Sequence, residues 1–327
     1  MKKYTLFLIA LAGVFFVSCS SLRTISYDQL CPAQVSFPYQ IGTVGIVNNT
    51  PSRPAPKDNI LTLGHLEGEG KSATENLAGM IADSKYFNQV IICDSALQSK
   101  GETEPLTQLQ VQELTSMLGV DMLISFERLL MDVQKKEYQQ PGWGVSIPVI
   151  QVSLTPVVRF YVPERSQPLM TLSQTDTIYF DSSVRISEKS LMEEASHYAS
   201  QVMSDKIVPY WEQAHRHYFD GGCVEMRDAC VYVREGNWTE ARKIWISLYE
   251  RLKKGNTKFK AAFNIALSYE MIGDMNNAEE WLKKSSNYVS PKSQEEDVLK
   301  FYISQFNERK SVYSKLNIQM KRFDGNS

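Results

Sequence analysis

The chain has 327 residues, of which 43% are hydrophobic and 22% are charged, and its formal net charge is −2. This composition is typical of a folded globular protein and excludes a disordered or fibrous chain. A near-neutral charge without a clustered basic segment argues against nucleic acid as a partner.

The first feature in chain order is a secretion signal at residues 1–18. Two lysines precede an uncharged apolar run, Tyr4–Val17, which is shorter than a membrane-spanning helix requires. Ser18 then directly precedes Cys19, which is the arrangement of a bacterial lipoprotein signal. We therefore expect cleavage before Cys19 and lipidation of its thiol, so that the lipid anchor binds the protein to a membrane. An uncleaved signal anchor and a plain secretory signal are the alternatives.

The next part of the chain is predicted to be a tether followed by alternating strands and helices. Residues 19–40 show no periodicity and are interpreted as the tether. Hydrophobic patterns then predict a strand at 41–47, a helix after Ser72, a buried strand at 90–92 and a helix capped by Thr107 and ended by Gly119.

Three antiparallel strands and a long helix are predicted next. The strands are expected at residues 122–131, 147–162 and 169–180, joined by two hairpin connections. A helix capped by Ser187 or Ser190 follows, and we expect Pro209 to kink it before it ends near Phe219.

The element order over residues 40–215 resembles a known kind of envelope domain. Together with the segments Gly42–Asn48 and Leu118–Ile124, it is similar to the small α/β domain of lipoproteins related to the curli-secretion channel protein and to the activators of penicillin-binding proteins. The resemblance implies a mixed sheet (β-α-β-α-β-β-β-α) over residues 41–220, a protein-docking module and no catalytic residues.

The last third of the chain contains an internal repeat. Ala229, Tyr232, Gly236, Ala241 and Trp245 recur 37 residues later as Ala266, Tyr269, Gly273, Ala278 and Leu282. The spacing predicts two helical hairpins, in which the glycines allow the turns and the alanines allow close helix approach. It resembles the tetratricopeptide repeat, and two unrelated hairpins are the alternative.

The predicted fold class is therefore α+β, with an all-α, tetratricopeptide-like array over residues 221–327 after the α/β domain. A further helix beginning at Ser290 and Pro291 should close the array at one end. The helix predicted to end near Phe219 should close it at the other end.

No catalytic or metal-binding motif is present in the sequence, and no cofactor is expected. His215 and His217 are placed on a helix, where they would face different sides. The disulfide state of four cysteines is left open by their spacing: Cys31, Cys93, Cys223 and Cys230.

Four residues are candidates for binding. Trp143 lies between glycines at a predicted hairpin tip, where an exposed tryptophan could anchor a partner. Arg234, Asn264 and Tyr269 are expected on the concave face of the repeats, where such arrays usually receive peptides.

These features predict a Gram-negative, Bacteroidota-like lipoprotein of the outer membrane that faces the periplasm. Its expected function is non-enzymatic docking of an envelope protein or peptide. A glycan-binding or nutrient-binding lipoprotein of an uptake system is the first alternative, and an undetected hydrolase is the second.

Overall fold

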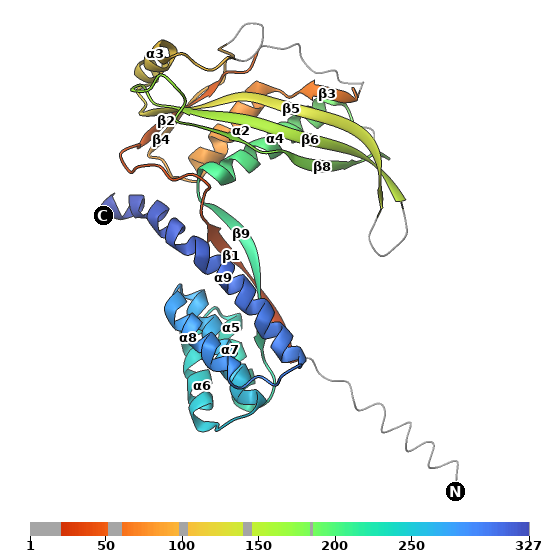
Figure 1. Cartoon of the computed structure of the whole chain (residues 1–327), viewed down its shortest axis with the longest axis vertical. Helices are drawn as coiled ribbons and strands as arrows, with labels where there is room; N and C mark the ends of the chain where they lie inside the picture. Colours follow the sequence, from red (N-terminus) through yellow and green to blue (C-terminus); the bar gives the residue numbers. More distant parts are fainter. Residues whose placement is uncertain (1–20, 52–60, 98–103, 140–145, 184–185, 327) are drawn as a thin grey trace. The chain divides into compact units, whose positions relative to one another are not determined.

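The computed structural model describes residues 21–51, 61–97, 104–139, 146–183 and 186–326. Contacts within the chain divide it into two compact units. The sheet unit comprises residues 30–210 and 315–327, and the repeat unit comprises the chain up to Gln29 together with residues 211–314. The fold class is α+β, with a mixed sheet followed in the sequence by a helical array (Figure 1), which confirms the predicted class.

The described part of the sheet unit contains a seven-stranded mixed sheet with strand order β4-β2-β5-β6-β7, in which β3 also pairs with β5 and β8 with β6. The strands are β2 (Thr43–Asn48), β3 (Gly64–Glu67), β4 (Gln89–Cys93), β5 (Met122–Gln139), β6 (Ser146–Tyr161), β7 (Met170–Ser173) and β8 (Asp176–Asp181). Strand β2 is parallel to both of its neighbours, β4 and β5. The other pairs are antiparallel.

Two of the predicted strands differ from the observed ones. The strand predicted at 169–180 is two strands, β7 and β8, which both pair with β6. The strand predicted to end at Met131 continues to Gln139, because its polar end still forms backbone hydrogen bonds with β6. Hydrophobicity marks the covered part of a strand, whereas backbone pairing extends beyond it.

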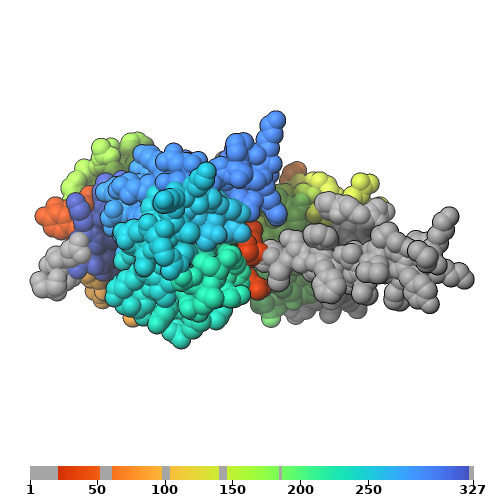
Figure 2. All heavy atoms as spheres, turned by 90° about the horizontal axis from the view of Figure 1, so that it is seen from below, coloured from red at the N-terminus to blue at the C-terminus, as the bar shows by residue number. Residues whose placement is uncertain are grey.

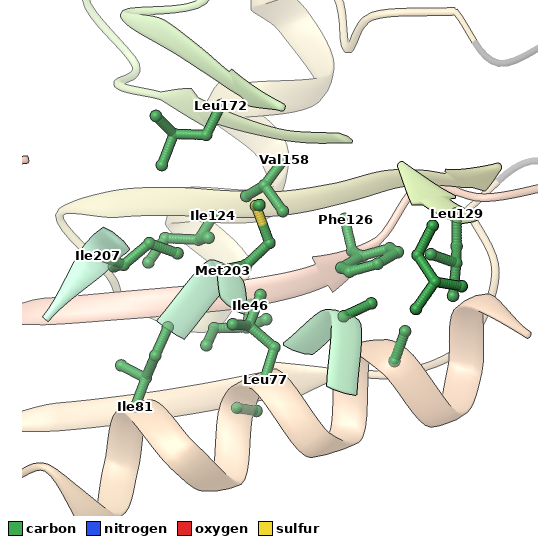
Figure 3. Packing of buried hydrophobic residues seen from close by; sticks show 14 of the residues in the cluster. Ile46, Leu77, Ile81, Ile124, Phe126, Leu129, Val158, Leu172, Met203 and Ile207 are labelled. Atoms are coloured by element: carbon green, nitrogen blue, oxygen red, sulfur yellow. The ribbon is translucent and has the colours of Figure 1, made fainter. Parts of the chain in front are cut away.

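Helices α2 (Gly70–Asp83) and α4 (Glu188–Ile207) cover one face of the sheet. Figure 3 shows the resulting core, in which Leu77 of α2 and Met203 of α4 face Ile46, Ile124 and Phe126 of the strands. Complete burial of these side chains is the main source of stability in this unit.

Helix α3 (Gln108–Leu118) lies over the other face of the sheet, next to β2 and β5. The side chain of Thr107 accepts a hydrogen bond from the backbone N–H of Gln110, and the Gln110 side chain bonds the backbone of Thr107 in return. Gly119 ends the helix with a φ of +66°, a conformation that favours glycine. Both predicted helix ends are confirmed.

The repeat unit contains α5 (Val224–Arg234), α6 (Trp238–Arg251), α7 (Asn256–Met271), α8 (Met275–Ser286) and the first part of α9 (Gln294–Met320). The predicted repeat positions form the helix contacts and the turns that the spacing predicts. Their four alanines are fully buried, and Trp245 and Leu282 lie in the same core. The turn glycines Gly236 and Gly273 have φ values of +73° and +83°.

The two repeats also share their turn hydrogen bonds. The backbone N–H of Asn237 donates to the carbonyl of Tyr232 at 2.8 Å, and that of Asp274 donates to the carbonyl of Tyr269 at 2.9 Å. Asn237 and Asp274 then cap α6 and α8 with their side chains. The two hairpins are therefore copies of one local structure.

The start of α9 corrects one sequence prediction. The helix begins at Gln294, so Pro291 lies in the connection before it and is not its first residue. Ser293 instead accepts a hydrogen bond from the backbone N–H of Glu296 at 3.2 Å, which caps the first turn.

Residues 19–40 are not a tether where the structure describes them. They form β1 (Leu22–Cys31), which pairs with β9 (Tyr210–Phe219). The segment up to Phe219 was predicted as helix, but α4 ends at Ile207 before Pro209, because a residue preceding proline avoids the helical conformation. The domain boundary predicted at 220/221 therefore falls inside the repeat unit as contacts define it.

The segment after β1 is also fixed, within the sheet unit. The Gln319 side chain accepts a hydrogen bond from the N–H of Ala33 at 3.0 Å and donates to the carbonyl of Val35 at 2.7 Å. The Lys315 ammonium donates to the carbonyl of Gln34 at 2.7 Å. The short helix η2 (Lys321–Asn326) follows, and its Arg322 lies over the ring of Tyr86 at 4.1 Å.

Among the described residues, we find no helix whose length and hydrophobicity would let it span a bilayer. Cys19 lies outside the described residues.

Candidate functional site

The predicted binding residue Asn264 is not available to a peptide. Its side chain is fully buried. It donates to the carbonyl of Phe219 at 2.7 Å and accepts from the N–H of Phe219 at 2.9 Å. The amide therefore satisfies the backbone of β9, which occupies the face that was expected to be a concave binding surface.

The other sequence candidates have different surroundings. The ring of Tyr269 lies under the Arg242 guanidinium, whose central carbon is 4.2 Å from the ring centroid. Arg234 is exposed in the last turn of α5. Trp143 lies outside the described residues. The expected peptide site formed by Arg234, Asn264 and Tyr269 is thus not assembled.

A buried carboxylate near the C-terminal end of α7 holds β1, β9 and α9 on this helix. Glu270 is fully buried and accepts hydrogen bonds from the Arg216 Nη2 at 2.9 Å and the Arg309 Nη1 at 2.8 Å. The Tyr302 hydroxyl donates to its second oxygen at 2.7 Å. Burial, followed by the Glu270 charge, raises the pKa of Tyr302 well above its usual value.

The Arg309 guanidinium also donates to the Tyr27 hydroxyl of β1 at 3.1 Å. Both Glu270 oxygens accept hydrogen bonds from protein donors, so the cluster is a structural joint in which paired charges offset the cost of burial.

His215 and His217 lie on one side of a strand, because β9 replaces the predicted helix and residues two apart in a strand share a face. The His217 Nδ1 is 3.0 Å from the Thr24 hydroxyl, and the His215 Nδ1 is 2.9 Å from the Ser26 hydroxyl. These pairs join β9 to β1 in an antiparallel register. Within the described residues, no three His, Cys, Asp or Glu side chains are placed to hold a metal ion.

A polar cluster lies where the parallel strand β2 ends, a common position for ligand sites in α/β sheets. Glu127 is 1% exposed and sits at the β-bulge of β5. It accepts from the Asn49 side chain at 2.7 Å and from the Tyr161 hydroxyl at 3.0 Å. Burial raises the pKa of Glu127, and its neighbours offset this only in part.

The same cluster holds the loop that leads into α3. The Asn49 amide also donates to the carbonyl of Glu104 at 2.9 Å, and the N–H of Leu106 donates to the Tyr161 hydroxyl at 3.2 Å. The buried polar groups therefore bind this chain's own backbone, and the cluster anchors the loop before α3.

A different surface of the sheet unit has no described helix packed on it. It lies on the long ribbon of β5 and β6, on the face opposite α2 and α4 and beyond α3 (Figure 1). We call it the open sheet face. The strand registers place these residues on it: Leu130, Asp132, Gln134, Lys136, Tyr138, Ile147, Val149, Gln151, Ser153, Thr155, Thr177, Tyr179 and Asp181.

The open sheet face combines exposed rings with short hydroxyl side chains. Tyr138 and Tyr179 are 45% and 54% exposed, and their ring centroids are 5.8 Å apart. The Thr155 hydroxyl lies 2.8 Å from that of Thr175, and the hydroxyls of Ser153 and Thr177 are 3.4 Å apart. Exposed tyrosines beside small polar residues are typical of protein-binding surfaces.

The sequence contained a signal for this face. Along residues 150–155 an apolar residue alternates with a polar one, and the apolar residues are buried. Such alternation indicates an antiparallel strand with one face in solvent. Sequence reasoning missed the tyrosine pair, because Tyr138 and Tyr179 are 41 positions apart in the chain and meet only through the register of β6.

Two family models match the chain. The domain of unknown function DUF8603 matches residues 41–219, which is more than half of the chain. The chain belongs to this family. A second model, the domain of unknown function DUF6340, matches residues 227–308.

A search of curated proteins finds no match. Solved structures with some similarity include the PelC dodecamer from Paraburkholderia phytofirmans, which is 12% identical, covers 56% of this chain and 97% of its own, and has a TM-score of 0.27. The hypothetical protein CT253 from Chlamydia trachomatis is 9% identical, covers 50% of this chain and 96% of its own, and has a TM-score of 0.28. At these scores neither likeness supports a functional argument.

Proposed function

We propose that this protein is a non-enzymatic outer-membrane lipoprotein that docks another envelope protein through the open sheet face. The observation that carries the proposal is the exposed pair formed by Tyr138 and Tyr179 on that face. The lipid anchor at Cys19 and the tetratricopeptide-like character of α5–α8 are parts of the same proposal, supported by the signal sequence and by the repeated turns.

The pair is suited to binding because its backbone is already ordered. Tyr138 is paired with Ile147 on β6, and Tyr179 is paired with Gln151 on the same strand. Binding would therefore order two side chains and no loop, which lowers the entropic cost of association. Tyrosine has few rotatable bonds for its contact area, which lowers that cost further.

The ring geometry favours a protein partner over a glycan. The two rings are inclined by 55°, so they do not form the single flat platform on which a sugar ring stacks. The neighbouring hydroxyl pairs already bond one another across the strands. Glycan binding through an uptake system is the alternative outcome of the tests below.

The first test is photo-crosslinking in living cells. A benzophenone amino acid placed at Tyr179, and separately at Tyr138, should each capture the same envelope protein. Tyr39 is the matched control, because it is a 77% exposed tyrosine of the same unit outside the open sheet face. Capture of that protein equally from Tyr39, or no protein captured from either ribbon position, would count against the proposal.

The second test uses alanine substitution. Tyr138→Ala combined with Tyr179→Ala should weaken binding of the captured protein by about 2 kcal/mol or more, because central tyrosines are common hot spots. Tyr39→Ala should leave binding unchanged. Thermal unfolding of all variants checks that the loss is not one of folding. If a glycan panel, and no protein, bound in a tyrosine-dependent manner by calorimetry, the alternative would replace the proposal.

A further inference from the structure

The chain enters the repeat unit at a fixed point. The carbonyl of Ser21 accepts a hydrogen bond from the N–H of Asp220 at 2.8 Å, and its hydroxyl accepts one from the Lys260 ammonium at 2.8 Å. Ser21 also packs against Gly221 so closely that an added Cβ there would lie 2.5 Å from the Ser21 Cβ. In Figure 2 the red start of β1 lies beside the teal residues that lead into α5.

This entry point lies at one particular end of the helical hairpins. Helices α5 to α8 are joined by connections of three or four residues, so consecutive helices run antiparallel and their connections alternate between two ends. Gly222 lies against Thr257 at the start of α7, so Ser21 shares its end with the α6–α7 connection. The connection before α9 is at this end too, because Asn256 bonds Glu295 at 2.9 Å.

The connections at the two ends carry opposite charge. At the entry end, residues 252–255 and 287–293 contain three lysines and no acidic residue: Lys253, Lys254 and Lys292. At the other end, residues 235–237 and 272–274 contain Glu235 and Asp274 and no basic residue. Solvation alone would not produce this asymmetry, because acidic and basic side chains keep a connection in contact with water equally well.

The lysines at the entry end are available, whereas most nearby carboxylates are engaged. Lys253, Lys254 and Lys292 are exposed and form no ion pair with a described residue. Glu225 is paired with Arg251, and Asp220 with Arg23. Glu295 is bonded to Asn256 and Glu296 to Lys300. Asp297 is exposed and offsets one of the lysine charges.

We propose that the entry end of the repeat unit, formed by the connections 252–255 and 287–293 around Ser21, lies against the anionic headgroups of the leaflet that holds the anchor. This inference rests on the lipidation of Cys19 in the proposed function. Ser21 is two positions after Cys19, so their Cα atoms are no more than about 8 Å apart. Without a longer spacer, the surface around Ser21 has to meet the headgroup region.

Charge then selects the orientation. The negative surface potential of an anionic leaflet decays over roughly 8–10 Å at physiological ionic strength, and basic residues within that distance are attracted. The exposed Val224 at the start of α5, 56% exposed, lies two residues after Gly222 and adds an apolar contact at the same end.

The test is lysine footprinting of the full-length mature protein. Native lipidated protein is reconstituted into vesicles of phosphatidylethanolamine and phosphatidylglycerol, labelled with an acetylating reagent and read by peptide mass spectrometry. The reference is the Cys19→Ser protein in solution. Lys253, Lys254 and Lys292 should be acetylated several-fold more slowly on the vesicles. Lys243, which is on α6 nearer the opposite end and 66% exposed, should react equally in both samples.

The outcomes separate this inference from its premise. If the intact mass of the native protein lacks acyl chains, the anchor in the proposed function fails. If the acyl chains are present but Lys253 and Lys254 react as fast as in solution, the anchor stands and the inference is overturned. Equal slowing of all exposed lysines would also overturn it, because no particular end would then face the lipid.

A charge-reversal experiment tests whether the lysines attract the protein to anionic lipid. In the unlipidated Cys19→Ser background, Lys253→Glu with Lys254→Glu should lower partitioning onto phosphatidylglycerol vesicles by at least about 25-fold, because the loss of two positive charges alone accounts for about that factor. Arg234→Glu with Lys243→Glu changes the net charge equally at the opposite end and should have a much smaller effect. Equal loss in both double variants would overturn the proposed orientation.

Discussion

Both units bury a glutamate, but they compensate its charge differently. Glu270 of the repeat unit accepts hydrogen bonds from two guanidinium groups and a tyrosine. Glu127 of the sheet unit accepts them from an amide and a tyrosine, and its nearest cation, the Arg159 Nη1, is 3.5 Å away. A carboxylate matched by two cations is a fixed ion cluster, whereas one held mainly by neutral donors can take up a proton at modest cost.

The largest expected effect is on the ion cluster. Glu270→Gln should lower the free energy of unfolding of the repeat unit by about 3–5 kcal/mol, because it leaves the buried Arg216 and the partly buried Arg309 without their counter-charge. Urea unfolding followed by tryptophan fluorescence measures this loss, since Trp245 is fully buried in this unit.

The matched control for that experiment is Glu235→Gln, which changes an exposed carboxylate in the α5–α6 connection. It should change stability by less than about 0.5 kcal/mol. A loss below about 1 kcal/mol in Glu270→Gln would mean that the cluster is not a structural joint.

A smaller effect is expected for the two amides that hold backbone segments. Asn264→Ala leaves the N–H of Phe219 unpaired and its carbonyl with only the weak Cys230 thiol donor. Gln319→Ala removes the partner of the N–H and carbonyl of Ala33 and of the carbonyl of Val35. Each should cost about 2–4 kcal/mol, because buried backbone groups lose their partners.

Hydrogen exchange read by mass spectrometry distinguishes the two amide variants. Asn264→Ala should speed exchange in peptides around Phe219, and Gln319→Ala in peptides covering residues 32–36. If both variants accelerated the same peptides, the assignment of one amide to each unit would be wrong.

The smallest effect is expected for Glu127→Gln, which should change stability at pH 7 by no more than about 1 kcal/mol. Its effect lies in the pH dependence. Because the folded pKa of Glu127 is raised above the ordinary value of 4.5, the folded state binds a proton more tightly than the unfolded state. The stability from this group is complete below pH 4.5 and is lost as the pH rises through the folded pKa.

The measurement compares wild type and variant between pH 4.5 and 7, because other carboxylates contribute equally to both. The wild type should gain stability relative to Glu127→Gln as the pH falls through this window. Glu164→Gln, in an exposed turn, is the control and should follow the wild type. If the free energies of unfolding of wild type and Glu127→Gln changed in parallel between pH 4.5 and 7, Glu127 would not take up a proton in this pH range.

Local signals in the sequence predicted local structure well. The spacing of Gly236 and Gly273 predicted both helical hairpins, and Thr107 and Gly119 predicted both ends of α3. These signals succeed because capping and turn residues act on their own few neighbours. The strands β1 and β9 were missed, because each is stable only when paired with a segment about 190 positions away.

The candidate site was harder to predict for a related reason. Asn264 was expected on an open surface, although α7 is apolar on nearly all sides, from Phe259 to Leu267. A helix that is apolar all round is buried, so its polar residues must bond other parts of the chain. That reading would have placed both Asn264 and Glu270 inside the protein.

The route of the chain through the two units has a practical consequence for anyone who wishes to express them separately. A fragment beginning at Gly221 would lack β1 and β9, and would leave Asn264 without Phe219 and Glu270 without Arg216. A fragment ending at Asp220 would lack Gln319 and Arg322, which hold residues 33–41. A cut between the two matched family regions, near residue 220, should therefore give insoluble products. A circularly permuted or full-length chain keeps each unit whole.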